Sequence, residues 1–413
     1  MSLYFKTVQT TLEAIENGSL TISEVLNSYL KNIGDNNGSL NAIISQTPDS
    51  LIEKSLKRLE KSKKSYKNLP PLLGLPIAVK DLENTRGLLT TCGSPIFQTN
   101  IPKSDSPMVR NLKRAGCIII GKTNVPEFGI GSQTFNKVFG PTRNPININL
   151  TSGGSSGGAA AAVASGMLPF ADGSDMMGSL RNPAAFCSIY GFRPTPTLIP
   201  VNDPQDNLPR LSTLGGLAQT TKCLTYLLDA QIGSFNNSKS RTLLFSELVD
   251  SPLTKKEIRI AWLGTFNGSY IYEPEIEILC QNYLKSLSSH NVKIDDFSPK
   301  FSAEQLWESW TTLRCQSIKQ NLGPHYSNPK TKRLLKPEIL WEIEKASCLT
   351  NEKVKMALGL REEWIRFLKD VFQTFDFLML PSAQVFPFSI KCQYPSEING
   401  TTMDTYHRWM EVV

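Results

Sequence analysis

Two glycine-rich segments that carry serines are the strongest chemical signal in the sequence. The first, Gly153–Gly158 (GGSSGG), runs directly into the helix-forming stretch Ala159–Ala164. Consecutive glycines ahead of a helix let backbone N–H groups converge on an anion or a developing oxyanion. The second, Asp172–Ser179 (DGSDMMGS), follows the apolar run MLPFA, so we expect Ser179 just past the end of a strand. Ligands bind at the carboxyl ends of parallel strands, so these segments could bring Ser155 and Ser179 together.

Other interpretations of GGSSGG are weaker. A flexible linker would be expected between two domains, but no composition shift separates the flanking segments. A phosphate-binding loop needs a lysine after its last glycine, and none follows. A nucleophile elbow matches Gly153–Gly157 literally, but the preceding PININLTS lacks the apolar content of a buried strand. The elbow also needs a histidine, and the three candidates lie in helical or polar stretches: His290, His325 and His407.

A base other than histidine is therefore a serious candidate. A lysine can act as a base if burial removes its charge. Lys80 directly follows the apolar run Leu75–Val79 (LPIAV), which we expect to be a buried strand. The alternative for a lysine at a strand end is a surface salt bridge.

The elements expected around these residues alternate between helices and strands. Thr21 and Glu24 form a capping box ahead of a helix that continues to Ile33. Helical spacing around Val109 leads to Gly116 and then to a strand at Cys117–Ile120, and similar alternation returns after residue 258. We predict an α/β fold over residues 1–413: one large domain with a mixed, mostly parallel twisted sheet and helices on both faces.

Composition excludes several classes of protein. The net charge of +7 is spread along the chain, and the one dense run, Lys54–Lys67, has the pattern of an outer helix face, so we expect no nucleic-acid or membrane partner. The eight cysteines form no C-x-x-C pair, which predicts free thiols, a reducing cytoplasm, and no metal or cofactor. No apolar run approaches the ~18 residues of a membrane span.

Five motifs occur in an order that resembles the amidase signature family: GLPIAVKD, GKTNVPEFGIGS, FGPTRNP, GGSSGGAAAAVASG and DGSDMMGSLRNPAAFC. The likeness is greatest to a bacterial branch with D-M-M-G-S-L-R-N-P, and it is dense over residues 72–195. It implies the amidase signature fold and a Ser-Ser-Lys triad, with Ser179 as nucleophile, Ser155 as relay and Lys80 as general base. It also implies a cis peptide bond before Ser155 and two further sets of residues. These are an oxyanion hole of backbone N–H groups (Met176, Met177, Gly178 and Ser179) and four supporting residues (Ser156, Ser174, Asp175 and Arg181).

The resemblance leads to three hypotheses about function. The first is an amidase that hydrolyses a small aliphatic or aryl carboxamide through a Ser179 acyl-enzyme and releases a carboxylate and ammonia or an amine. The second is the glutaminase subunit of a tRNA-dependent amidotransferase. The third is an inactive remnant, because family members continue with a strand–helix portion after a segment like Tyr406–Val413. The expected partner is a small amide, and a homodimer is left open.

Overall fold

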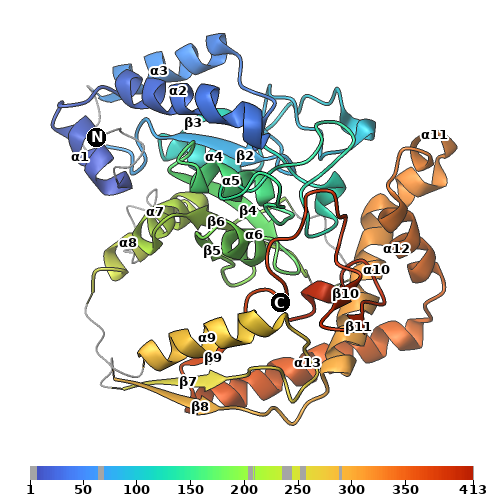
Figure 1. The fold of residues 1–413 in the computed structure, drawn as a ribbon. Coiled ribbons are helices and arrows are strands. Elements are labelled where there is room, and N and C mark those ends of the chain that lie inside the picture. Colours follow the sequence, from blue (N-terminus) through green and yellow to red (C-terminus); the bar gives the residue numbers. More distant parts are fainter. Residues whose placement is uncertain are drawn as a thin grey trace. The chain divides into compact units, whose positions relative to one another are not determined.

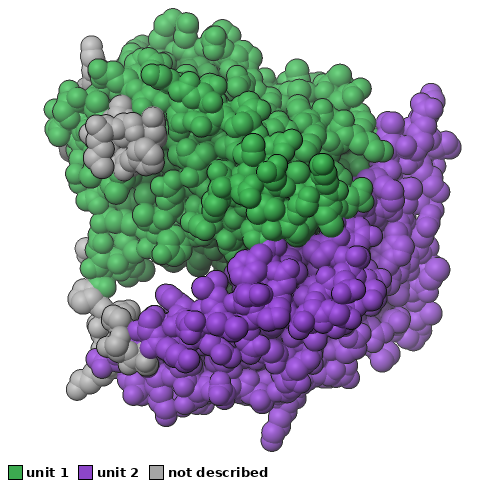
Figure 2. Space-filling view, in the orientation of Figure 1, with its two compact units in different colours: residues 1–206, 212–251, 387–393 green, residues 207–211, 252–386, 394–413 purple. Residues whose placement is uncertain are grey.

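The structure is a computed structural model that describes residues 7–63, 69–202, 208, 210–234, 244–251, 257–287 and 291–412. The chain divides into two compact units, coloured separately in Figure 2. The first unit comprises residues 1–206, 212–251 and 387–393, and the second comprises residues 207–211, 252–386 and 394–413. All the predicted site residues belong to the first unit.

Two three-stranded sheets lie in the described part of the first unit. One has the order β1-β3-β2, in which β2 (Pro76–Lys80) runs parallel to β3 (Ile118–Thr123) and β1 (Ile43–Ile44) pairs antiparallel with β3. The other has the order β4-β6-β5 and is antiparallel throughout; its strands are β4 (Phe170–Asp175), β6 (Thr213–Ala218) and β5 (Tyr190–Phe192). β4 lies beside β2, so the two sheets are neighbours.

The antiparallel sheet differs from the mostly parallel arrangement that the sequence predicts. β4 and β5 do run in the same direction, as expected for two strands joined by a helix, α6 (Arg181–Phe186). β6 then inserts between them and runs the opposite way. Nothing in the alternation of strands and helices indicates this insertion, because it depends on a later segment of the chain.

Helices cover these sheets, as Figure 1 shows. α5 (Gly157–Ala164) packs against β4 and β6, and its residues from Gly157 to Val163 are buried, as expected for a helix that is apolar on all sides. α2 (Ile22–Leu40) begins with the predicted Thr21–Glu24 capping box. The other helices of this unit are α1 (Val8–Glu16), α3 (Asp49–Lys63), α4 (Pro107–Arg114), α7 (Thr221–Ile232) and α8 (Phe245–Leu248).

The second unit contains a parallel sheet with the order β8-β7-β9, built from β7 (Ile258–Trp262), β8 (Val292–Asp296) and β9 (Phe377–Met379). This confirms the strand–helix–strand alternation expected after residue 258. Its other elements are α9 (Pro274–Leu287), α10 (Ala303–Ser327), α11 (Pro329–Lys332), α12 (Pro337–Ser347), α13 (Asn351–Thr374), β10 (Glu397–Ile398) and β11 (Thr401–Thr402). The α/β fold class is thus confirmed. Within the described ranges, no helix is both long and apolar enough to cross a membrane.

Close packing, and not helix propensity, explains the glycine at the start of α5. A Cβ on Gly158 would lie 2.6 Å from Asn124 O and 2.7 Å from Ala42 O, and backbone atoms cannot yield easily. We therefore expect Gly158→Ala to lower the free energy of unfolding by about 3 kcal/mol. Gly34→Ala is the matched control, because Gly34 is an exposed position of α2 with open space around it. The free energy of unfolding of Gly34→Ala should be about 0.5–1 kcal/mol higher than that of the wild-type protein. Urea unfolding measures both, and equal effects would contradict the argument.

Candidate active site

Lys80, the last residue of β2, is buried, and its side chain is surrounded by hydroxyl groups. Its Nζ lies 2.9 Å from Ser155 Oγ and 2.7 Å from Ser156 Oγ. Ser174 adds its Oγ at 2.9 Å and its carbonyl oxygen at 3.3 Å. Four oxygen atoms surround a nitrogen that carries at most three N–H donors, so at least one contact is not a hydrogen bond donated by Lys80. An ammonium offers three donors here, and a free amine offers two donors and one acceptor, so the cluster can hold either protonation state. The burial of Lys80 shows that the alternative of a surface salt bridge is wrong.

The burial of Lys80 also changes its basicity. Burial lowers the pKa of Lys80 to about 7, against the opposing effect of the Asp172, Asp175 and Glu83 carboxylates. Removing an ammonium group from water disfavours its charged form. Near neutral pH, a substantial fraction of Lys80 is therefore the free amine, which can take a proton from a hydroxyl group.

Backbone packing fixes the loop that carries Ser155. The peptide bond between Gly154 and Ser155 is cis, as the resemblance implies, and Gly153 has a φ of +73°, which favours glycine. A Cβ on Gly154 would lie 2.9 Å from the main chain of Gln133, so only glycine permits this approach. At the start of α5, the Gly157 N–H donates to Thr134 Oγ1 at 3.1 Å.

The loop that carries Ser179 follows the end of β4, as the sequence predicts. Ser179 is 8% exposed. The Ser156 N–H donates to Ser179 O at 3.2 Å, so the two serine segments lie side by side. Among the described residues, Lys80 is the only hydrogen-bond partner of Ser155 Oγ, and Ser179 Oγ has none. The structure therefore joins Lys80 to Ser155 but shows no hydrogen bond between the Ser155 and Ser179 hydroxyls.

Asp175 organises the turn between β4 and α6. Arg181 donates to it from Nε (3.0 Å to Oδ2) and from Nη2 (2.9 Å to Oδ1). A second arginine, Arg193, places its Nε 3.7 Å from Asp175 Oδ1. The sequence patterns did not single out this residue. Burial alone would raise the pKa of Asp175, but the hydrogen bonds and charge of Arg181 outweigh it and hold that pKa below its usual value. An ionised Asp175 thus fixes the conformation of the turn.

The predicted oxyanion donors differ in their surroundings. The Gly178 N–H donates to Asp175 Oδ1 at 2.8 Å, so this amide is already engaged, contrary to the expectation. The Met177 and Ser179 amides have no acceptor within the described ranges. The role of Met176 stays a prediction. Gly178 instead serves the turn, where its φ of +84° favours glycine.

Three buried charged residues near Lys80 were not singled out by the sequence patterns. Asp172 accepts the Lys80 backbone N–H at 3.0 Å. Asp81 accepts the Thr91 hydroxyl at 2.6 Å, and Lys122 donates to Thr85 Oγ1 at 3.1 Å. Each follows an apolar run: LPIAV and Lys80 precede Asp81, CIIIG precedes Lys122, and MLPFA precedes Asp172. The signal that selected Lys80 could therefore have found them too.

The elbow interpretation lacks its histidine. Ser155 Oγ contacts Lys80 and no imidazole in the described part of the chain. His407 belongs to the second unit, where its Nδ1 lies 2.8 Å from Thr405 Oγ1 and its ring packs edge-on against Trp307. His290 lies outside the described residues. Lys80 is therefore the base that the geometry offers to Ser155.

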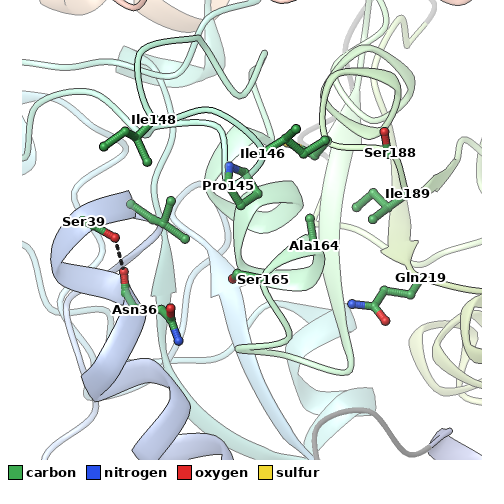
Figure 3. A pocket seen from close by; sticks show the side chains of 12 residues that line it. Asn36, Ser39, Pro145, Ile146, Ile148, Ala164, Ser165, Ser188, Ile189 and Gln219 are labelled. Carbon is green, nitrogen blue, oxygen red and sulfur yellow. Dashed lines mark hydrogen bonds between the residues drawn. The ribbon is translucent and has the colours of Figure 1, made fainter.

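A separate hollow in the first unit does not provide an alternative site. It encloses about 650 Å³ and is shown in Figure 3. None of the predicted site residues lines it, and no charged side chain does; its lining includes Asn36, Ser39, Ile146, Ile148, Ser165 and Gln219. It therefore lacks a group that could act as a base at neutral pH.

Comparisons with known proteins find relatives over most of the chain. The Amidase family model matches residues 24–413. A glutamyl-tRNA(Gln) amidotransferase subunit of Exiguobacterium sibiricum is 38% identical over 300 residues, which cover 72% of this chain and 62% of that relative's length. The acylamidase of Rhodococcus erythropolis is 28% identical over 399 residues, with 94% of this chain and 81% of that protein covered.

A solved structure shows the same fold. A bacterial aryl acylamidase of the amidase signature family superposes with a TM-score of 0.89 at 22% identity, covering 100% of this chain and 87% of that one. At this identity the likeness shows the fold alone. Fold and site together define an α/β protein in which a buried amine meets a cluster of serine hydroxyls. The family match over nearly the whole sequence then decides its membership: the chain belongs to the amidase family.

Proposed function

We propose that the protein is an amidase that hydrolyses a small aliphatic or aryl carboxamide through an acyl-enzyme on Ser179. The observation that carries the proposal is the buried Lys80 Nζ, 2.9 Å from Ser155 Oγ. Burial lowers the pKa of Lys80 to about 7, so the free amine is present near neutral pH. The identification of the chain as an amidase family member supports the same reaction.

The reaction divides the work among three side chains. Neutral Lys80 takes the proton of Ser155 while Ser155 takes that of Ser179, and Ser179 Oγ attacks the carbonyl carbon. The relay then reverses and protonates the leaving nitrogen, which would otherwise depart poorly. Water attacks the acyl-enzyme by the same route and releases the carboxylate. The Ser155–Ser179 contact has to form when substrate is bound.

Backbone amides stabilise the oxyanion in this mechanism. The Met177 and Ser179 N–H groups, which have no acceptor among the described residues, are the best placed donors. Each such donor typically contributes ~3–4 kcal/mol to the transition state. Gly178 supports them indirectly, since Asp175 holds its amide and so fixes the turn.

A fluorophosphonate tests this assignment without knowledge of the substrate. Intact-mass analysis and peptide mapping should find one adduct, on Ser179, because the relay makes that hydroxyl the nucleophile. Lys80→Met should remove the adduct. An adduct on Ser155, or none on folded protein, would contradict the proposal.

The second candidate is a glutaminase subunit of a tRNA-dependent amidotransferase. It is favoured by the likeness to the glutamyl-tRNA(Gln) amidotransferase subunit of Exiguobacterium sibiricum, although the matched part covers 62% of that relative. The two candidates share the site and differ in substrate and partners. Ammonia released from glutamine, with simple aryl amides left intact, would favour this second candidate.

A further inference from the structure

Asp172 is a buried carboxylate with fewer hydrogen-bond donors than its neighbours. Asp81 and Asp175 each accept three or more hydrogen bonds. Asp172 is 0% exposed, and its one hydrogen-bond donor in the described part of the chain is the Lys80 N–H, 3.0 Å from Oδ1 and 3.3 Å from Oδ2. Burying a carboxylate is costly unless its oxygens are satisfied. Packing alone therefore does not explain this residue.

Strand geometry explains why Asp172 meets Lys80. Neighbouring N–H groups of a strand point to opposite edges, and the Asp81 N–H donates to Thr123 O of β3 at 3.1 Å. The Lys80 N–H consequently points to the other edge of β2, where β4 lies. No ladder joins β2 to β4, so the Asp172 carboxylate takes the place of a ladder carbonyl. It thereby fixes the main chain from which the Lys80 side chain extends.

Charges from three neighbouring elements surround this pair. Lys80 faces Asp172 and Asp175 of β4, and Glu83 in the turn after β2. Asp172 in turn faces Lys122 of β3, which acts on it together with Lys80 and Glu83. Burial raises the pKa of Asp172, and the hydrogen bond from the Lys80 N–H and the charges of the two lysines oppose that rise. Of the three carboxylates that favour the charged form of Lys80, Asp172 has the largest effect.

We propose that Asp172 is a positioning residue of the hydrolytic site, whose carboxylate fixes the main chain at Lys80 and is the counter-charge shared by Lys80 and Lys122. The inference rests on the proposed function, in which neutral Lys80 is the general base. The hydrogen bonds of Asp172 include neither Ser155 nor Ser179, so it acts on the reaction through Lys80.

The decisive variant is Asp172→Asn, which keeps the shape and an acceptor for the Lys80 N–H but removes the charge. Without the carboxylate, Lys80 should lose its proton at lower pH. The rate of fluorophosphonate labelling at Ser179 should fall as the pH decreases, and we call this fall the acid limb. In the variant we expect the midpoint of the acid limb to move down by about one pH unit. Labelling at pH 6, relative to the plateau at high pH, should rise several-fold.

A matched control separates this role from a structural one. Asp229 of α7 is also buried and accepts the Phe245 N–H at 2.8 Å, away from the hydroxyl cluster. Asp229→Asn should lower the urea midpoint and leave the acid limb in place. If Asp172→Asn does not fold, Asp172→Ser removes the same charge and keeps a small acceptor, with the same shift expected.

The outcomes distinguish the inference from the function on which it rests. An acid limb that stays in place or moves to higher pH in a folded, labelled Asp172 variant overturns the inference alone. Absence of labelling in the wild-type protein overturns the proposed function and the inference with it. A downward shift in the Asp172 variant that Asp229→Asn does not reproduce supports both.

Discussion

Ser179→Ala should reduce amide hydrolysis by on the order of 10⁵-fold, because the acyl-enzyme can no longer form. The fold should remain intact. Ser179 Oγ has no hydrogen-bond partner among the described residues, so its removal leaves no buried group unsatisfied. We expect a change of less than about 0.5 kcal/mol in the free energy of unfolding. Steady-state turnover of an aryl amide and urea unfolding, measured on the same preparation, check both parts.

The control for this variant is Ser104→Ala, which removes an exposed hydroxyl in the loop ahead of α4. It should leave turnover and unfolding unchanged. Retention of more than about 1% of wild-type turnover by Ser179→Ala would sink the assignment of the nucleophile, since background catalysis by binding and backbone donors is far weaker than that.

Lys80→Met should reduce turnover by about 10³–10⁴-fold at pH 8, where general-base catalysis by the free amine is lost. Methionine keeps most of the buried apolar volume, so the variant tests the amine more than the packing. Loss of the Lys80 amine removes the hydrogen bonds to Ser155 and Ser156 and thus the path for the proton.

The pH dependence of the wild-type enzyme should identify the same group. Burial lowers the pKa of Lys80 to about 7, and only the neutral amine is a base. Consequently kcat/KM should be near its plateau above pH 8 and fall as the pH decreases through 7. The residual rate of Lys80→Met should lack this limb, and Lys103→Met, which changes an exposed lysine, should keep it. A limb of unchanged position in Lys80→Met would assign it to another group.

Local sequence patterns predicted several elements and pointed to candidate residues for the site. The Thr21–Glu24 capping box forms as expected, because its hydrogen bonds join residues three positions apart. The apolar run before Lys80 forms β2, since strands that are buried on both faces consist of consecutive apolar residues. β4 contains only the last two residues of the run MLPFA and continues through Asp172 to Asp175. The order of residues makes Lys80 and Ser179 candidates, and the resemblance to the amidase signature family implies their roles as base and nucleophile.

Contacts between distant segments decided the rest. The insertion of β6 between β4 and β5 depends on pairing between segments that are far apart in the sequence. The same holds for Asp172, whose carboxylate reaches the Lys80 N–H across two strands that no ladder joins. Gly178 shows the limit most clearly, because its amide was expected to serve an oxyanion and instead binds Asp175.

The sequence by itself thus determined which residue types lie at the ends of the buried strands, and therefore that an amine and two serine-bearing turns exist. Only the tertiary structure decided which hydroxyls surround Lys80, which carboxylates set its pKa, and which amides remain without an acceptor. The physical reason is that hydrophobic periodicity specifies the buried face of one element at a time. Hydrogen bonds and charges between elements depend on register and packing, which no single element encodes.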